Sequence, residues 1–177
     1  MIKQGLNVLK FGYHERKPTR LPNWDYSTPG YYFVTICVRE MACQLGDVVD
    51  EHVILSLEGK IAHQTWLELP NHYPGTGIEP FIIMPNHLHA IIEIGSTGGF
   101  SDCVAVENPP EKVKEYSLTE IIRAFKTWSA RRINLMNDTT GAPFWHRSFY
   151  DRIIRNEGEL HAIEKYIQSN PQRWVTP

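Results

Sequence analysis

The stretch PFIIMPNHLHAIIEI, residues 80–94, decides the fold of this chain. It consists of two short runs of apolar and β-branched residues, a composition typical of strands. The segment Met84-Pro85-Asn86 separates the two runs. Proline cannot donate to a central ladder, and both proline and asparagine favour turns. We therefore expect two strands joined by a turn around Pro85.

The second run brings two histidines to one side of its strand. Side chains alternate along a strand, so His87 and His89 point to the same face, about 6.5–7 Å apart at Cα. Such a pair can hold a metal ion, and a buried imidazole needs a partner. A His-x-His pair also arises by chance, and most single histidines are surface or satisfied core residues. The motif alone leaves both interpretations open.

Six further segments show the periodicity of a strand or a helix. In chain order they are a strand at 31–39, a short strand at 44–49, a helix at 55–69, a helix at 117–134, a strand at 144–154 and a helix at 157–170. A capping box at Ser117 and Glu120 and a cap at Asn156 mark two helix starts. The βαββαβ order predicts an α+β, ferredoxin-like or RRM-like sandwich: an antiparallel sheet, helices on one face, and a C-terminal helix.

The length of 177 residues suits one domain. Prolines and glycine punctuate the start, so residues 1–26 are expected to form a basic, irregular arm and residues 27–177 the domain. Residues 95–116 mix Gly, Ser, Pro and charges, which predicts a flexible insertion.

The composition favours a cytoplasmic protein. Its three cysteines have no C-x-x-C spacing, which argues against a disulfide framework or a structural zinc site. No apolar run reaches the ~18 residues that would span a bilayer. The first twenty residues lack the apolar stretch of a secretory signal. We therefore expect no membrane partner.

The net charge is only −2, but it is unevenly distributed. Residues 1–39 hold six Lys/Arg and two Asp/Glu, residues 40–116 three and twelve, and residues 117–177 nine and six. Positive charge therefore gathers at both ends of the chain and negative charge in the middle. Such a chain can still present a basic face to phosphates.

The last predicted helix carries a second polar pair. Tyr166 and Asn170 are four residues apart and so share one helix face. A tyrosine hydroxyl can accept a phosphoryl group, and an amide oxygen can complete a divalent metal site begun by two histidines. Taken singly, Tyr166 is better explained as a core aromatic and Asn170 as a helix C-cap before Pro171.

Three separated motifs in the right order resemble a known family. They are YYFVTICV, MPNHLHAIIEI and FWHRSFYDRIIRNEGELHAIEKYIQSNP, and the resemblance spans about residues 27–174. The chain resembles the REP-associated tyrosine transposases, which belong to the single-tyrosine HUH (His, bulky apolar residue, His) family of insertion-sequence-like transposases. The resemblance implies a ferredoxin-like enzyme that cuts single-stranded, hairpin-flanked DNA at REP-like repeats without ATP. It assigns His87, His89 and Asn170 to Mg²⁺ or Mn²⁺, and Tyr166 as the catalytic nucleophile.

The expected chemistry is strand transfer through a covalent 5′-phosphotyrosine, which a 3′-OH can reverse. Trp145, Phe149 or Tyr150 could stack on bases, although the same aromatics could equally be core residues. The cations expected to contact DNA are Arg16, Lys17, Arg20, Arg123, Lys126, Arg131, Arg147, Arg152 and Arg155.

Two other functions compete with this interpretation. A domesticated, non-catalytic module could bind single strands or hairpins without a metal, and the acidic middle and the insertion fit altered targets. A metal-dependent hydrolase would use His87 and His89 without a tyrosine, but it lacks further ligands. Tyr150 is a weaker nucleophile candidate than Tyr166 because it has no amide partner four residues on. We expect a cytoplasmic, nucleoid-associated protein, either a monomer or a homodimer.

Overall fold

The computed structural model describes residues 20–95 and 116–174. Residues 96–115 of the predicted insertion and residues 1–19 of the predicted arm, including Arg16 and Lys17, lie outside the described residues. The predictions for these segments therefore stay predictions.

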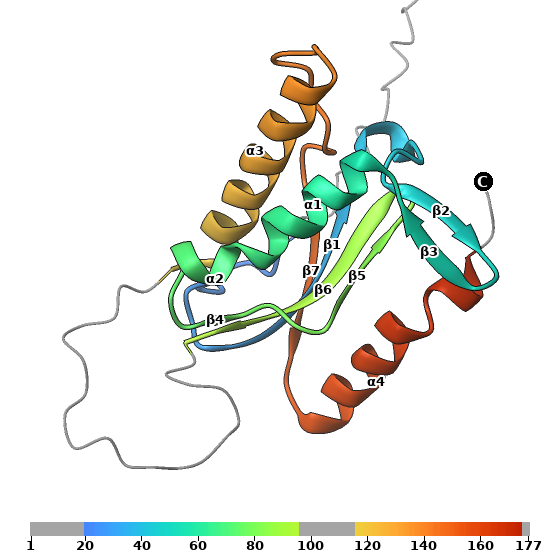
Figure 1. Cartoon of the computed structure of the whole chain (residues 1–177). Helices are drawn as coiled ribbons and strands as arrows, with labels where there is room; N and C mark the ends of the chain where they lie inside the picture. Colours follow the sequence, from blue (N-terminus) through green and yellow to red (C-terminus); the bar gives the residue numbers. More distant parts are fainter. Residues whose placement is uncertain (1–19, 96–115, 175–177) are drawn as a thin grey trace, which may run out of the picture.

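A single antiparallel sheet forms the centre of the molecule (Figure 1). Strands β1 (Gly30–Cys37) and β6 (His87–Ile94) lie side by side in its middle. Strand β7 (Tyr150–Ile154) pairs with the outer side of β1. The strands β5 (Phe81–Met84) and β4 (Thr76–Gly77) both pair with the outer side of β6. This order, β7-β1-β6-β5, is that of a ferredoxin-like sandwich, which confirms the predicted α+β fold.

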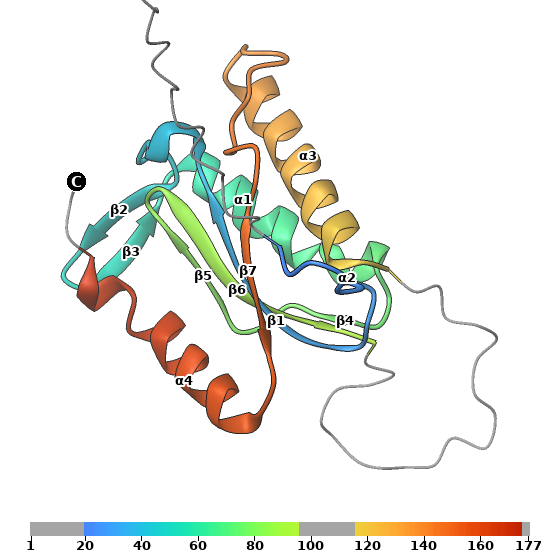
Figure 2. The same ribbon diagram turned by 180° about the vertical axis from the view of Figure 1, so that it is seen from behind.

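The helices lie on both faces of the sheet. Helices α1 (Leu57–Leu67) and α3 (Leu118–Met136) cover one face, and the short α2 (Leu69–His72) continues α1. The C-terminal helix α4 (Glu157–Gln168) lies against the opposite face (Figure 2). In the described part of the chain, no helix is long and apolar enough to cross a membrane.

The alternation of side chains along β1 and β6 divides the interior into two cores. The larger core lies between the sheet and the helices α1 and α3. Its members on the two central strands are Tyr32, Val34, Ile36, Leu88, Ala90, Ile92 and Ile94. The smaller core lies under α4 and is built around Ile91, Ile154, Ile163 and Ile167. The histidines of β6 point toward the smaller core, as the alternation predicts.

Side-chain caps fix the starts of the helices. The capping box at the start of α3 is present: Ser117 accepts from the Glu120 amide, and the Glu120 carboxylate accepts from the Ser117 amide. Asn156 caps α4, as expected from the sequence. Ser56 caps α1 by accepting from the amide of Gly59 at 3.0 Å. Such caps typically stabilise a helix by ~1 kcal/mol.

The predicted strand at 144–154 is shorter in the structure. It begins only at Tyr150, and the part before it meets β1 through a single bridge between Val38 and Trp145. Trp145 is buried, and its indole N–H donates to the Ser129 hydroxyl of α3 at 2.9 Å. The aromatic side chains of residues 144–149 are thus drawn toward the helix, which prevents continuous pairing with β1.

A small hairpin outside the main sheet was only half predicted. It pairs β2 (Gly46–Val49), the expected short strand, with β3 (His52–Leu55). The turn between them holds Asp50 and Glu51 in the left-handed region, with φ of 49° and 63°. Two-residue hairpin turns of this kind usually contain glycine or asparagine, so the sequence gives no clear turn signal here.

Candidate active site

The two histidine rings lie against one another on the α4 side of the sheet. Their centroids are 4.4 Å apart, and the rings meet edge to face. In the pairing of β6 with β1, His89 lies opposite Thr35 and His87 opposite Cys37. The His89 side is closed by Phe33, which stacks on its ring at 5.3 Å. The prediction that both rings share one face is confirmed.

Each ring uses its Nδ1 atom in a contact with a neighbouring polar side chain. His87 Nδ1 lies 2.6 Å from Asn86 Oδ1, and His89 Nδ1 lies 2.9 Å from Thr35 Oγ1. Burial lowers the pKa of His87 to about 4. Burial, and secondly the nearby His87, lower the pKa of His89 to about 3. Both imidazoles are therefore neutral at pH 7, the form that binds a metal ion.

Helix α4 brings Tyr166 to this pair. The Tyr166 hydroxyl lies 3.3 Å from His89 Nε2, and its ring meets the His89 ring edge-on at 5.2 Å. About a third of Tyr166 remains exposed, so a substrate can reach the hydroxyl. The Arg173 guanidinium lies 5.9 Å from the centre of the Tyr166 ring.

Asn170 lies just beyond the end of α4, at the start of the short helix η2 (Pro171–Arg173). Its backbone angles are still helical, so it stays on the same side as Tyr166. The side chain is buried, and its polar contact with the His87 ring partly offsets the drop in the pKa of that ring. This contact falls short of hydrogen-bond geometry, so His87 Nε2 has no such bond. The structure thus brings together all four residues that the sequence singled out: His87, His89, Tyr166 and Asn170.

The donor atoms of this cluster fit a divalent cation. His87 Nε2 is buried and has no hydrogen-bond partner among the described residues, and an unpartnered buried polar atom needs an explanation. Imidazole nitrogens and an amide oxygen are both ligands of divalent metal ions, so these residues could hold one. Within residues 20–95 and 116–174, no cluster of three His, Cys, Asp or Glu residues offers an alternative metal site.

Tyr150 lies on the same face of the sheet but in a different setting. It is at the start of β7, opposite Thr35 on β1, and 57% of it is exposed. In the described part of the chain it makes no hydrogen bond to either histidine. Of these two tyrosines, Tyr166 is the one whose hydroxyl contacts the histidine pair.

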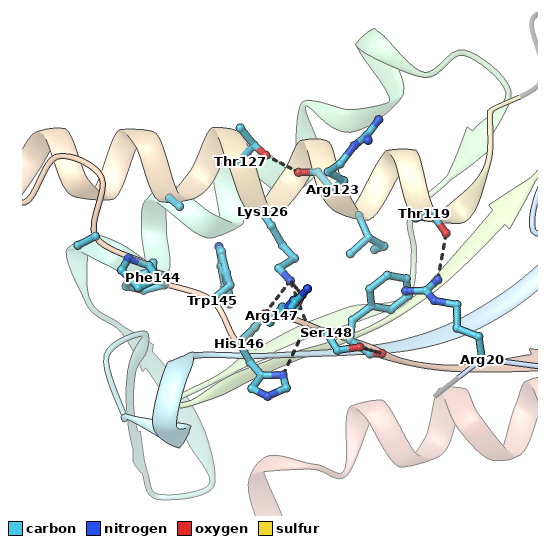
Figure 3. A pocket seen from close by; sticks show the side chains of 15 residues that line it. Arg20, Thr119, Arg123, Lys126, Thr127, Phe144, Trp145, His146, Arg147 and Ser148 are labelled. Carbon is cyan, nitrogen blue, oxygen red and sulfur yellow. Dashed lines mark hydrogen bonds between the residues drawn. The ribbon is translucent and has the colours of Figure 1, made fainter. Parts of the chain in front are cut away.

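A second site lies on the other side of the molecule, between α3 and residues 142–149. It is an open cleft of about 640 Å³, and none of the described residues that line it is acidic (Figure 3). The cleft brings together Arg20, Arg123, Lys126 and Arg147 from three separate segments. The helix spacing of Arg123 and Lys126 was visible in the sequence, but the approach of the other two was not.

The four cations of the cleft have different roles. Lys126 donates to the carbonyls of His146 and Arg147 at 2.7 and 2.9 Å, so its charge holds the loop (Figure 3). Burial lowers its pKa. In the described residues Arg20, Arg123 and Arg147 make no salt bridge with a carboxylate. Arg20 instead donates to the Thr119 hydroxyl at 3.0 Å. Arg123 and Arg147 are therefore the cations of the cleft that are most available for an anion.

The other predicted DNA contacts lie outside this cleft. Arg152 forms a salt bridge with Glu159 at 3.1 Å, and the Arg155 backbone amide donates to the same carboxylate. Arg152 and Arg155 line a smaller hollow beside β7, which Arg20 also lines. Arg131 is exposed on α3 but does not line the cleft.

The predicted base-stacking aromatics are divided by the fold. Trp145 and Phe149 are buried, and the Arg20 guanidinium covers the Phe149 ring at 4.0 Å. Their interpretation as core residues is the one that the structure supports. Tyr150 alone of the three keeps an exposed ring.

A known protein is similar to this chain over nearly its whole length. An uncharacterised protein of Haemophilus influenzae is 32% identical over 171 residues, covering 92% of each chain. The chain belongs to the same family as this Haemophilus protein. No protein-family model matches it.

A solved structure has the same fold as this chain. It is the structure of a REP-associated tyrosine transposase bound to a REP hairpin. The TM-score is 0.62 at 17% identity, over 88% of this chain and 75% of the other. The fold implied by the three sequence motifs is therefore confirmed.

We call His87, His89, Tyr166 and Asn170, with the residues that contact the two rings through Nδ1, the histidine–tyrosine cluster. Sequence reasoning missed two of its members, Thr35 and Asn86. Thr35 reads as an ordinary β-branched strand residue, and Asn86 as an ordinary turn residue. For Asn86 a signal existed, because it directly precedes the first histidine. The role of Thr35 depends on the register between β1 and β6, which no local pattern reveals.

Proposed function

We propose that the protein is a metal-dependent, single-strand DNA endonuclease and transposase of the single-tyrosine HUH class. It would cut and rejoin hairpin-flanked DNA through a covalent 5′-phosphotyrosine. The observation that carries the proposal is the approach of the Tyr166 hydroxyl to His89 Nε2 at 3.3 Å, beside the unpartnered Nε2 of His87. The partly exposed Tyr166 of α4 and the neutral imidazoles of β6 come from distant segments and lie next to one another.

His87, His89 and Asn170 would hold Mg²⁺ or Mn²⁺. When bound, such an ion neutralises charge that builds on the phosphoryl oxygens and polarises the scissile phosphate. The chain supplies the rest of the site. Phe33 fixes the His89 ring by stacking, and the small core beneath α4 fixes the height of the helix above the sheet. Because Thr35 occupies Nδ1 of His89, only Nε2 is free as a ligand, so Tyr166 must release that atom.

In the transfer step, the Tyr166 oxygen attacks the phosphorus and forms a P–O bond to the tyrosine. The bond between phosphorus and the 3′ oxygen breaks, and that oxygen leaves as a 3′-OH after taking up a proton. The phenol loses its proton during attack, because its ordinary pKa is ~10. One phosphodiester replaces another, so a 3′-OH can reverse the step without ATP.

The cationic cleft beside α3 would hold the phosphate backbone of the DNA. Guanidinium groups bind phosphates in a bidentate manner, and Arg20, Arg123 and Arg147 lie around one cavity of suitable size. The aromatic floor is buried, so the cleft is suited to phosphates rather than to bases. A protein that handles such DNA would be associated with the nucleoid.

The decisive experiment is a search for the covalent adduct. Labelled single-stranded hairpin oligonucleotides, drawn from the DNA that flanks the gene, are incubated with the protein and Mg²⁺ or Mn²⁺. A tyrosine nucleophile leaves a protein–DNA adduct that survives denaturing electrophoresis and depends on the metal. Tyr166→Phe keeps the ring but removes the hydroxyl, so the adduct should vanish while binding persists.

The matched control is Tyr150→Phe, which should keep the adduct. An adduct that survives Tyr166→Phe contradicts the assigned nucleophile. Bound hairpin with no adduct under any condition favours the non-catalytic binding module, and cleavage by water without an adduct favours a hydrolase.

A further inference from the structure

We propose that Asn86 and Thr35 are positioning residues that hold His87 and His89 in one tautomer, with the proton on Nδ1. Both Nε2 atoms then present lone pairs to the space between α4 and the sheet. The use of those lone pairs for a cation rests on the proposed function, but the tautomers themselves do not.

The geometry around His87 points to this tautomer. Its Nδ1 lies 2.6 Å from the side-chain oxygen of Asn86, and an amide oxygen can only accept. With the Asn86 amide in this orientation, the ring donates from Nδ1, which leaves Nε2 without a proton. That Nε2 atom is buried and has no hydrogen-bond partner among the described residues. A neutral imidazole has a single N–H, and in His87 that N–H is donated to the Asn86 side-chain oxygen.

Asn86 is itself held firmly. It is buried, with 5% of its surface exposed, in the turn between β5 and β6. Its backbone carbonyl accepts from the Val38 amide at 2.8 Å, which ties the turn to the end of β1. The backbone of Asn86 is therefore fixed beside the His87 ring, which its side-chain oxygen contacts.

The second ring is fixed from β1. His89 Nδ1 lies 2.9 Å from the Thr35 hydroxyl, which could donate or accept. A proton on Nδ1, the nitrogen that faces β1, lets the Thr35 hydroxyl accept from the ring. His89 Nε2 is then an acceptor, and the Tyr166 hydroxyl at 3.3 Å can donate to it.

The tautomer matters because a ring in the wrong form points an N–H into the site. A cation cannot bind that nitrogen until the proton moves. Groups that hydrogen-bond the second nitrogen of a ligating histidine typically change metal affinity or activity by about 10–100-fold. We expect an effect of this size from either positioning residue.

Nitrogen-15 spectra of the histidine rings test the proposal directly, without metal or DNA. The chain has eight histidines, so the spectra of His87→Gln and His89→Gln assign the two signals. The wild type should show both rings with the proton on Nδ1. Asn86→Leu should convert His87 to a mixture of tautomers and weaken Mn²⁺ binding, measured by titration, about 10–100-fold. Thr35→Val should do the same for His89.

Conservative variants separate positioning from general stability. Asn86→Asp keeps an acceptor at the same place and Thr35→Ser keeps the hydroxyl, so both should retain the wild-type tautomers. The control is Asn134→Leu, which removes another buried amide, one that donates to the Ala142 carbonyl far from the histidines. It should lower stability but leave the tautomers and Mn²⁺ affinity unchanged.

A wild-type His87 with its proton on Nε2 overturns the proposal, and this outcome needs no variant to fold. Unchanged tautomers and Mn²⁺ affinity in folded Asn86→Leu and Thr35→Val also overturn it. Confirmed tautomers with no covalent DNA adduct leave this inference standing while the transposase proposal fails.

Discussion

The two faces of the sheet are built from the same strands but differ in what they carry: one supports a large core, and the other a small core and a polar cluster. On the α1 and α3 side, β1 and β6 contribute aliphatic side chains and Tyr32 to a large core. On the α4 side, a small core of four isoleucines leaves room beside it for two histidines, a threonine and a tyrosine. The polar cluster thus lies on the face where fewer apolar contacts are needed to hold the fold.

This difference shows how the site gains its rigidity. Leu88 and Ala90 are fully buried in the large core, and they alternate with His87 and His89 along one strand. Any movement of the histidine backbone would disturb the packing on the other face. The large core therefore fixes the histidines, whereas α4, held by the smaller core, positions Tyr166.

The largest expected effect comes from removing both imidazoles on the α4 side. The double variant His87→Gln, His89→Gln roughly preserves side-chain volume but removes both ring nitrogens. Adduct formation should fall by at least about 10³-fold, because charge on the transferring phosphate loses its stabilisation. Hairpin affinity should stay within about twofold, since the cleft lies on the other side. Gel assays of adduct and binding measure the two.

The control for this pair is His63→Gln. His63 lies on α1 and packs against Phe81, outside the histidine–tyrosine cluster. It should leave the adduct unchanged. Equal losses of adduct and of hairpin binding in the double variant would mean that the two sites are not separate.

Truncating one residue in each core should separate stability from chemistry. Phe125 is fully buried and contacts Trp66 and Trp145 at ring distances of 5.0 and 5.3 Å. Phe125→Ala should lower the free energy of unfolding by about 3–5 kcal/mol, and Ile163→Ala by about 2 kcal/mol or more. Urea denaturation measures both.

The same two variants should behave in the opposite way in the adduct assay. Per folded molecule, Phe125→Ala should keep most of its activity, because the α4 side is untouched. Ile163→Ala should lose more, because α4 carries Tyr166. A larger loss of adduct in Phe125→Ala would show that the large core governs the position of the nucleophile.

Acid should destabilise the protein through the α4 side. Burial lowers the pKa of His87 to about 4 and of His89 to about 3 in the folded state, against ~6.5 in the unfolded chain. Between pH 6.5 and 4 the unfolded chain binds more protons, so the free energy of unfolding falls as pH falls. Since each unit of pKa shift corresponds to ~1.4 kcal/mol, we expect this part of the loss to be on the order of 5 kcal/mol, and stability from these groups to be flat above pH 7.

The double variant His87→Gln, His89→Gln isolates this contribution from that of the carboxylates. Its stability curve should be shallower than the wild type between pH 6.5 and 4, as measured by urea denaturation at each pH. Parallel curves for the two proteins would mean that the histidines titrate normally in the fold.

Local patterns in the sequence predict most helices and strands, and they predict that His87 and His89, and likewise Tyr166 and Asn170, share a face. The alternation in residues 87–94 gives the shared face of the histidines, and the four-residue spacing gives that of Tyr166 and Asn170. The contacts of Thr35 and Arg20 depend on strand register and on how distant segments pack, which are not encoded locally. Residues 144–149 were misjudged because their aromatics resemble a strand, yet the Trp145–Ser129 hydrogen bond draws them to α3.

The smallest expected effect lies in the cleft on the α3 side. Arg123→Gln with Arg147→Gln removes two cations that make no salt bridge with a carboxylate in the described residues. Hairpin affinity should fall about tenfold, and the slope of log K against log salt should become shallower by about 1.8, since each phosphate contact adds about 0.9. At saturating DNA the rate of adduct formation should be unchanged, because the α4 side is intact.

The control for the cleft is Arg132→Gln. Arg132 is also on α3 but is turned toward α1, where it pairs with Glu68 at 2.7 Å. Equal losses of affinity in the control and the double variant would mean that the cleft makes no specific contact with the DNA.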